Sequence, residues 1–298
     1  MVDGSGACSV LWRNASEAVW GTAPVALFWV ALEAPGPWGA KAFTESRMEP
    51  SVGASIERRC ADHGGRASLI RRPGRHPERA GERTVLIATG LATDAPRLWQ
   101  GSVDSPQEVL SLPWEALAGD VPHLPGFDPA PPQLLVCTNG SRDACCALLG
   151  RGIAERGDGQ RPGQVWEASH LAGHRFAPTA LVLPAGYSLG YLDASVIVPV
   201  LDSAVRHELP WTVPGLRGRV GLPEPAQVVD CHLRATRRAS GLALWCIDVV
   251  SVSPDAWDVT AVIDGVSIVH RVTRSTGPDA RPVSCGKAAE PVVRWTLD

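Results

Sequence analysis

The sequence predicts an α/β protein built from two similarly ordered units followed by a C-terminal α+β extension. Three observations predict it. Two consecutive stretches pass through strand and helix patterns in the same order, a proline-rich stretch, VPHLPGFDPAPP (121–132), separates them, and the pattern changes beyond about residue 210. The 298 residues, 45% hydrophobic and 20% charged, are enough for more than one domain with its own core.

The first unit, residues 1–125, carries four apolar segments with the length and composition of strands and two stretches with helical periodicity. The expected strands are VALFWVALE (25–33), RASLIRR (66–72), RTVLIAT (83–89) and RLWQGSV (97–103), and the expected helices lie at 45–63 and 109–118. The unit therefore runs strand, helix, three strands, helix.

The second unit, residues 126–212, repeats this order. The expected strands are QLLVCTNG (133–140), QVWEASH (164–170), TALVLPAG (179–186) and SLGYLD (188–193), and the expected helices lie at 145–157 and 194–205. This order is close to that of a thioredoxin-like unit. The sequence thus predicts two thioredoxin-like lobes, the first degenerate and the second carrying the site described below.

Residues 213–298 form the expected extension. AQVVDCHLRATRR (226–238) has the pattern of a helix. LALWCIDVVSV (242–252) and VTAVIDGVSIVHRV (259–272) alternate as strands do, and the second is expected to fold back at Asp264-Gly265.

Composition excludes several classes of function. A net charge of -3 gives no reason to expect nucleic acid, and no apolar run reaches the roughly 20 residues of a membrane span. The N-terminus, MVDGSGACSV, lacks the basic and apolar regions of a signal peptide, so we expect a cytoplasmic protein. In the cytoplasm the eight cysteines are expected to be reduced, buried or metal-bound.

Two thiols and two imidazoles fall in successive turns of the second unit. Cys137-x8-Cys146 is followed after 23 residues by His170-x3-His174, whereas the matching turns of the first unit, APGPWG and RRPGR, contain neither residue type. No Glu lies between the two His residues, which argues against a zinc protease. Soft thiolates with imidazoles suit zinc or an iron–sulfur cluster, and the alternative is buried cysteines beside a solvated His pair.

Three stretches resemble the sucrase/ferredoxin-like family: CTNGSRDACC, VWEASHLAGHRFAPTALVLPAGYSLGYL and GTAPVALFWVALEAPGPWGAKAF. The resemblance implies a thioredoxin-like ferredoxin with a 2Fe-2S cluster. On this pattern Cys137 and Cys146 match the thiolate ligands, and His170 and His174 match the imidazole ligands. Cys145, one residue short of the spacing, is the fallback ligand.

The chain departs from the family pattern at two positions. Asn139 stands where the family often has His, and Ala172 stands where Gly is common. Neither departure removes a ligand, although a Cβ at position 172 can tighten the turn.

We therefore expect an electron carrier rather than an enzyme, serving a redox partner protein, with a reduction potential that falls as pH rises. Two alternatives remain: a structural zinc module with the same four ligands, and a thioredoxin-fold thiol oxidoreductase. The second is disfavoured because Cys145 and Cys146 are adjacent rather than spaced as C-x-x-C. The other cysteines, Cys8, Cys60, Cys231, Cys246 and Cys285, are scattered, and most are expected to be buried.

Overall fold

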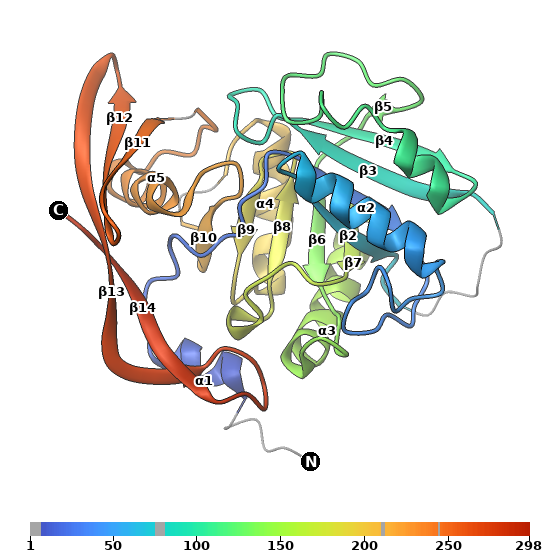
Figure 1. The fold of residues 1–298 in the computed structure, drawn as a ribbon, viewed down its shortest axis with the longest axis horizontal. Coiled ribbons are helices and arrows are strands. Elements are labelled where there is room, and N and C mark those ends of the chain that lie inside the picture. Colours follow the sequence, from blue (N-terminus) through green and yellow to red (C-terminus); the bar gives the residue numbers. More distant parts are fainter. Residues whose placement is uncertain (1–6, 75–80, 210–211, 244) are drawn as a thin grey trace.

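The computed structural model describes residues 7–74, 81–209, 212–243 and 245–298, which form two β-sheets with helices packed on them (Figure 1). The larger sheet is mixed and has ten strands in the order β10-β9-β8-β6-β7-β2-β1-β3-β4-β5. The smaller is antiparallel, in the order β11-β12-β13-β14. The α/β class expected from the sequence is confirmed.

The first half of the large sheet is built from β1 to β4. β1 (Trp29–Glu33) runs parallel to β2 (Arg66–Arg71) and antiparallel to β3 (Arg83–Thr89), which pairs with β4 (Arg97–Val103). α2 (Pro50–Asp62) connects β1 to β2 and buries Val52, Ile56 and Cys60. Within the linker stretch, β5 (Asp128–Pro129) pairs with β4.

The α-helix expected at 109–118 does not form. A 3₁₀-helix, η2 (Pro106–Ser111), occupies the start of that stretch, and turns follow it. Pro113 explains the difference, because proline lacks an N–H and disfavours helical geometry at the residue before it.

The second half of the large sheet repeats the strand arrangement of the first. β6 (Gln133–Cys137) runs parallel to β7 (Val165–Ala168) and antiparallel to β8 (Ala180–Leu183), which pairs with β9 (Tyr187–Leu189). α3 (Ala144–Gln160) connects β6 to β7, and α4 (Ile197–Val205) follows the short helix η4 (Ala194–Val196). The spatial orders β2-β1-β3-β4 and β7-β6-β8-β9 therefore correspond strand by strand.

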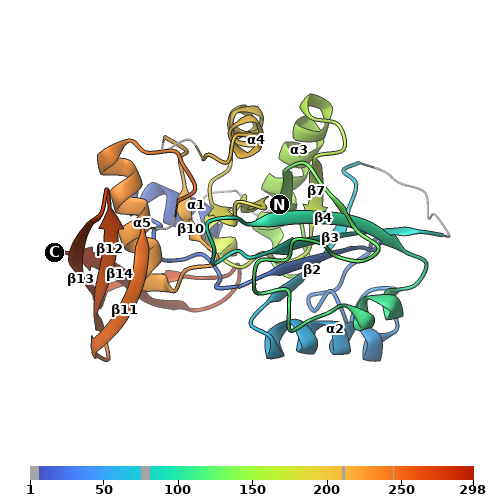
Figure 2. The same ribbon diagram turned by 90° about the horizontal axis from the view of Figure 1, so that it is seen from above.

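The two halves join where β2 meets β7 in an antiparallel pair, with Ile70 opposite Ala168. Side chains of both halves share one core on one side of this junction, including Trp29 and Ile70 from the first half and Leu135 and Trp166 from the second. Figure 2 shows α2 and the pair α3 and α4 extending in opposite directions from the twisted strands.

The C-terminal part extends the large sheet and adds the small one. β10 (Leu216–Arg219) pairs with β9, and α5 (Glu224–Arg237) packs between β10 and the small sheet. That sheet consists of β11 (Cys246–Ser253), β12 (Ala256–Ile263), β13 (Val266–Pro282) and β14 (Ala289–Leu297). The fold-back expected at Asp264-Gly265 lies between β12 and β13. Residue 244 of the strand expected at 242–252 lies outside the described residues.

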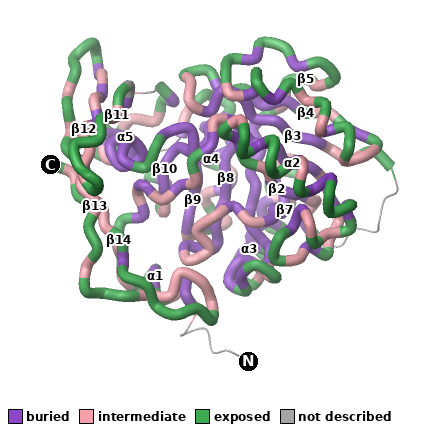
Figure 3. The backbone as a smooth tube through the Cα atoms, in the orientation of Figure 1, coloured by how far each residue is buried: buried purple, intermediate pink, exposed green. Residues whose placement is uncertain are grey.

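The long β13–β14 hairpin brings the C-terminal part back to the second half of the large sheet. The N-terminal helix α1 (Cys8–Asn14) contacts both β13 of this hairpin and the short helix η3 (His174–Phe176). Figure 1 shows α1 beside the hairpin. The strands of the large sheet are mostly buried, whereas the small sheet is largely half-buried or exposed (Figure 3). The hairpin turn and α1 thus lie next to the turns that carry the predicted site.

Candidate metal centre

The two thiols of the predicted site are positioned by the end of β6 and the start of α3. Cys137 is the last residue of β6, Cys146 lies in the first turn of α3, and both are buried. Asp143 begins the helix by accepting the Cys145 N–H at 3.0 Å. A Cβ on Gly150 would lie 2.3 Å from the Cys137 carbonyl oxygen, so glycine there allows α3 to approach the strand end closely.

The two imidazoles come from the turn after β7. Their ring centroids are 5.4 Å apart with an interplanar angle of 40°. Ala172 and Gly173 between them both adopt left-handed backbone conformations, with φ of 62° and 71°. The buried Arg217 donates to the Ala172 carbonyl oxygen at 3.1 Å, which fixes the turn from the adjacent strand β10.

Electrostatic contacts connect the four side chains. Hydrogen bonding to the Cys146 thiol lowers the pKa of Cys137 well below its ordinary value; burial opposes this, and the His170 ring lowers it further. Burial lowers the pKa of His174, while the charges of Asp143 and Cys137 act to raise it. Cys137 therefore interacts with Cys146 and His170, and His170 lies beside His174. The compact group of possible metal ligands among the described residues, within 4.8 Å of one another, is a different one and is described below.

One ring nitrogen of each histidine has no hydrogen-bond partner among the described residues. The Nδ1 atoms of His170 and His174 are buried and form no hydrogen bond with the described residues. The other nitrogen of His174, Nε2, lies 3.9 Å from Asp143 Oδ2. Because a buried nitrogen without a partner is costly, these atoms fit a site that a metal centre completes.

Cys145 has a different environment from the one expected of a fallback ligand. Its Sγ lies 3.7 Å from Cys8 Sγ and 3.0 Å from Cys285 Sγ. Together with Asp143 these three cysteines form a group whose ligand atoms all lie within 4.8 Å of one another. Sequence reasoning missed this group because its members come from both ends of the chain and from α3, and no sequence spacing connects them.

Two cavities lie near the site, and the smaller one is lined by one of the four predicted ligands. The smaller, of about 370 Å³, is lined by His170 together with the basic residues Lys41, Arg66 and Arg142. It opens His170 to the surface at the boundary between the two halves of the sheet.

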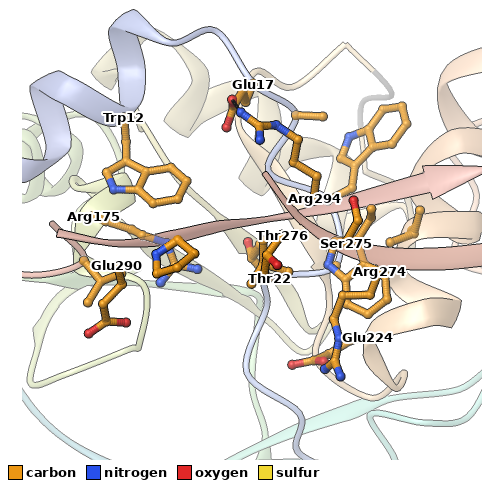
Figure 4. A pocket seen from close by; sticks show the side chains of 18 of the residues that line it. Trp12, Glu17, Thr22, Arg175, Glu224, Arg274, Ser275, Thr276, Glu290 and Arg294 are labelled. Atoms are coloured by element: carbon orange, nitrogen blue, oxygen red, sulfur yellow. Dashed lines mark hydrogen bonds and ion pairs between the residues drawn. The ribbon is translucent and has the colours of Figure 1, made fainter. Parts of the chain in front are cut away.

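The larger cavity, of about 850 Å³, lies between α1 and the small sheet (Figure 4). Arg175, the neighbour of His174, lines it, with its guanidinium 5.1 Å from the Trp12 ring centroid. The other two arginines of the lining form ion pairs. Arg294 lies 2.5 Å from Glu17, and Arg274 lies 2.8 Å from Asp255. The cavity thus shows no excess of one charge that would identify a ligand.

The chain is thus an α/β protein in which two buried cysteines lie near two half-buried histidines. Residues 19–218 match the model of the sucrase/ferredoxin-like family, and the chain belongs to that family. No curated protein and no solved structure matched the chain in the corresponding comparisons. Among the helices that the structure describes, none has the length and apolarity needed to cross a bilayer.

Proposed function

We propose that this protein transfers electrons through a 2Fe-2S cluster held by Cys137, Cys146, His170 and His174. The observation that carries the proposal is the convergence of two buried thiols with two imidazoles whose buried Nδ1 atoms lack partners. When bound, such a cluster takes up and releases a single electron. Membership in the sucrase/ferredoxin-like family supports the same assignment.

The repeated strand order supports the proposal that both halves are thioredoxin-like lobes. In each, the first strand is parallel to the second and antiparallel to the third, with a helix between the first two. Only the second lobe has a thiol at the end of its first strand, where Cys137 corresponds in position to Glu33. The first lobe then acts as scaffold and the second as the electron-carrying unit.

The protein's own groups determine the charge at the centre. Two thiolates are anionic and two imidazoles can stay neutral, so an added electron is better tolerated than with four thiolates. Nδ1 of His174 would hold the cluster, and Nε2 lies 3.9 Å from Asp143 Oδ2, whose carboxylate favours a proton on that nitrogen. Taking up an electron therefore favours taking up a proton on the histidines.

The cavity over His170 is the proposed docking place for a redox partner protein. Lys41, Arg66 and Arg142 make its lining basic, with Glu57 as the acid. A partner with an acidic surface beside its own redox centre would be guided to this opening. His170 would then be the ligand nearest the partner.

A redox titration at several pH values tests the cluster assignment. We expect a single one-electron transition whose potential falls as pH rises through the neutral and alkaline range, because the oxidised form loses an imidazole proton that the reduced form keeps. A potential that stays flat over this range would contradict histidine ligation.

Oxidation of the reduced protein by small complexes of opposite charge tests the docking surface. Exchanging Arg142 for Glu should slow oxidation by anionic ferricyanide severalfold at low ionic strength and accelerate oxidation by a cationic cobalt ammine complex. Arg237→Glu, at the end of α5, is the matched control. If the two substitutions changed the oxidation rates equally, electrons would not leave the protein through the cavity over His170.

A further inference from the structure

A second group of thiols lies next to the proposed cluster site and uses none of its ligands. Cys8 begins α1, Cys145 lies in the first turn of α3, and Cys285 lies in the turn of the β13–β14 hairpin. Their Sγ atoms form a triangle with sides of 3.7, 3.5 and 3.0 Å. Three segments that are far apart in the sequence thus converge on one point.

The triangle has nearly the dimensions of one face of a tetrahedral thiolate site. With metal–sulfur bonds of about 2.3 Å, as in zinc sites, the sulfur atoms of a regular tetrahedron lie about 3.8 Å apart. A disulfide needs two sulfur atoms about 2.05 Å apart and would leave the third thiol unused. Three mutually close thiols with a carboxylate beside them therefore fit a shared cation better than a covalent pair.

Asp143 supplies the fourth donor and is fixed in place. One of its oxygens accepts the Cys145 N–H at 3.0 Å, and the other accepts the Ser284 hydroxyl and the Cys285 N–H, both at 2.9 Å. These bonds hold the hairpin turn against the start of α3 without any metal. The donor set is therefore preorganised, and metal binding has little additional chain to order.

The surroundings suit a structural rather than a catalytic ion. Cys8, Cys145 and Asp143 are buried, and Cys285 is half-buried. Four protein donors leave no open position for a substrate, and sulfur-rich donor sets select soft or borderline cations over magnesium or calcium. The guanidinium of Arg175, which interacts with Cys8, offsets part of the negative charge of the thiolates.

We propose that Cys8, Cys145, Cys285 and Asp143 bind a zinc-like divalent cation that fastens α1 and the β13–β14 turn to the helix of the proposed cluster. The ion would connect the N-terminal and C-terminal segments to the second half of the large sheet. Loss of the ion would release α1 and the β13–β14 turn from α3 before the rest of the fold opens.

Metal analysis of purified variants tests the proposal. After expression with added zinc, the unsubstituted chain should hold about one zinc per chain. Cys8→Ala/Cys285→Ala should lose it, while Cys60→Ala, which removes a buried thiol in α2, should keep it. His170→Ala/His174→Ala should also keep this zinc, whatever happens to iron. Zinc lost only with the histidines would overturn the proposal and favour a structural zinc centre at the other site.

Two further measurements keep the test decisive if the double variant fails to fold. Cobalt added to metal-stripped, reduced protein should give thiolate-to-cobalt absorption that Cys285→Ala alone reduces sharply and Cys60→Ala does not. Intact mass under non-reducing conditions should show all eight cysteines reduced. A loss of two hydrogens, with a disulfide mapped to Cys145 and Cys285, would overturn the proposal.

Discussion

The two halves of the large sheet have the same strand order but different chemistry at the ends of their strands. β1 ends in Glu33 and leads into a Gly/Pro turn, whereas β6 ends in Cys137 and leads into a turn that places a second thiol on the following helix. The helices differ in the same way, since exposed Glu49 caps α2 and buried Asp143 caps α3. The two halves therefore share a backbone arrangement and differ in the turn residues that would hold the proposed centre.

The half without the site still supports it. Asn139, in the thiol turn, donates to the Gly39 carbonyl oxygen at 3.0 Å, so the corresponding turns of the two halves touch. Ser169, which precedes the first histidine, exchanges hydrogen bonds with Leu69 of β2 through its backbone N–H and its hydroxyl. The position of the histidine turn thus depends on the first half.

Removing a thiol should give the largest effect and separate the halves most clearly. Cys137→Ala or Cys146→Ala should abolish the visible absorption of the purified protein, because the loss of one of four ligands prevents stable cluster assembly. Cys60→Ala in α2, the corresponding helix of the first half, should leave the spectrum intact. If Cys60→Ala lost the visible absorption and the Cys137 and Cys146 variants kept it, the cluster would belong to the first half of the sheet.

Exchanging an imidazole ligand for a thiolate should change the reduction potential of the cluster rather than abolish the cluster. His170→Cys or His174→Cys should retain a cluster and lower its potential by roughly 100 mV or more, because an anionic ligand replaces a neutral one. Replacing both should also flatten the dependence of potential on pH. Protein-film voltammetry measures both effects, and an unchanged potential would show that the substituted histidine is not a ligand.

The two helix caps provide a matched comparison of stability. Asp143→Ala should lower the free energy of unfolding by about 2 kcal/mol, since it leaves buried N–H groups of Cys145 and Cys285 without an acceptor. Glu49→Ala should cost less, because water can solvate the N–H groups at the exposed cap. Urea unfolding of both variants measures the difference, and equal losses would contradict the anchoring role of Asp143.

The same carboxylate predicts an acid-dependent loss of stability. Burial opposes its ionisation, but hydrogen bonds from Cys285, Ser284 and Cys145 outweigh this and lower its pKa below the ordinary 3.8. Because folding lowers this pKa, the stabilisation is fully present above the ordinary value of 3.8 and is lost as pH falls from there through the lowered pKa. Stability of the unsubstituted chain should therefore drop more steeply below about pH 4 than that of Asp143→Ala.

The smallest effect is expected in the histidine turn. Ala172 has a φ of 62°, a conformation that costs Ala more than Gly, so Ala172→Gly should raise the free energy of unfolding by about 0.5–1 kcal/mol. Gly173→Ala should act in the opposite direction, because its Cβ would lie 2.4 Å from the Arg217 guanidinium. Thermal unfolding of the two variants measures both signs, and stabilisation by both would contradict this account of the turn.

Local patterns in the sequence were enough to predict most of the helices and strands and to single out the two Cys and two His residues, while their assignment as ligands came from the family resemblance and stays a prediction. Strand β4 spans the predicted residues 97–103. The helix predicted at 226–238 forms as α5 and begins two residues earlier than predicted. The Cys and His pairs could be found because each falls in a turn at a strand end, where the chain order already implies proximity.

Contacts between distant segments could not be predicted in this way. Cys8 and Cys285 are separated by almost the whole chain, and only the β13–β14 hairpin brings them together. Arg217 carries no motif, yet it is buried and holds the histidine turn through the Ala172 carbonyl. Both depend on tertiary packing, which neither periodicity nor spacing encodes.

Iron and acid-labile sulfide analysis of the anaerobically purified protein, combined with its visible spectrum, tests the central claim most directly. The account predicts a red-brown protein with about two iron and two sulfide per chain, and loss of both in Cys137→Ala. A colourless protein with neither iron nor sulfide, but with zinc that His170→Ala/His174→Ala releases, would contradict it.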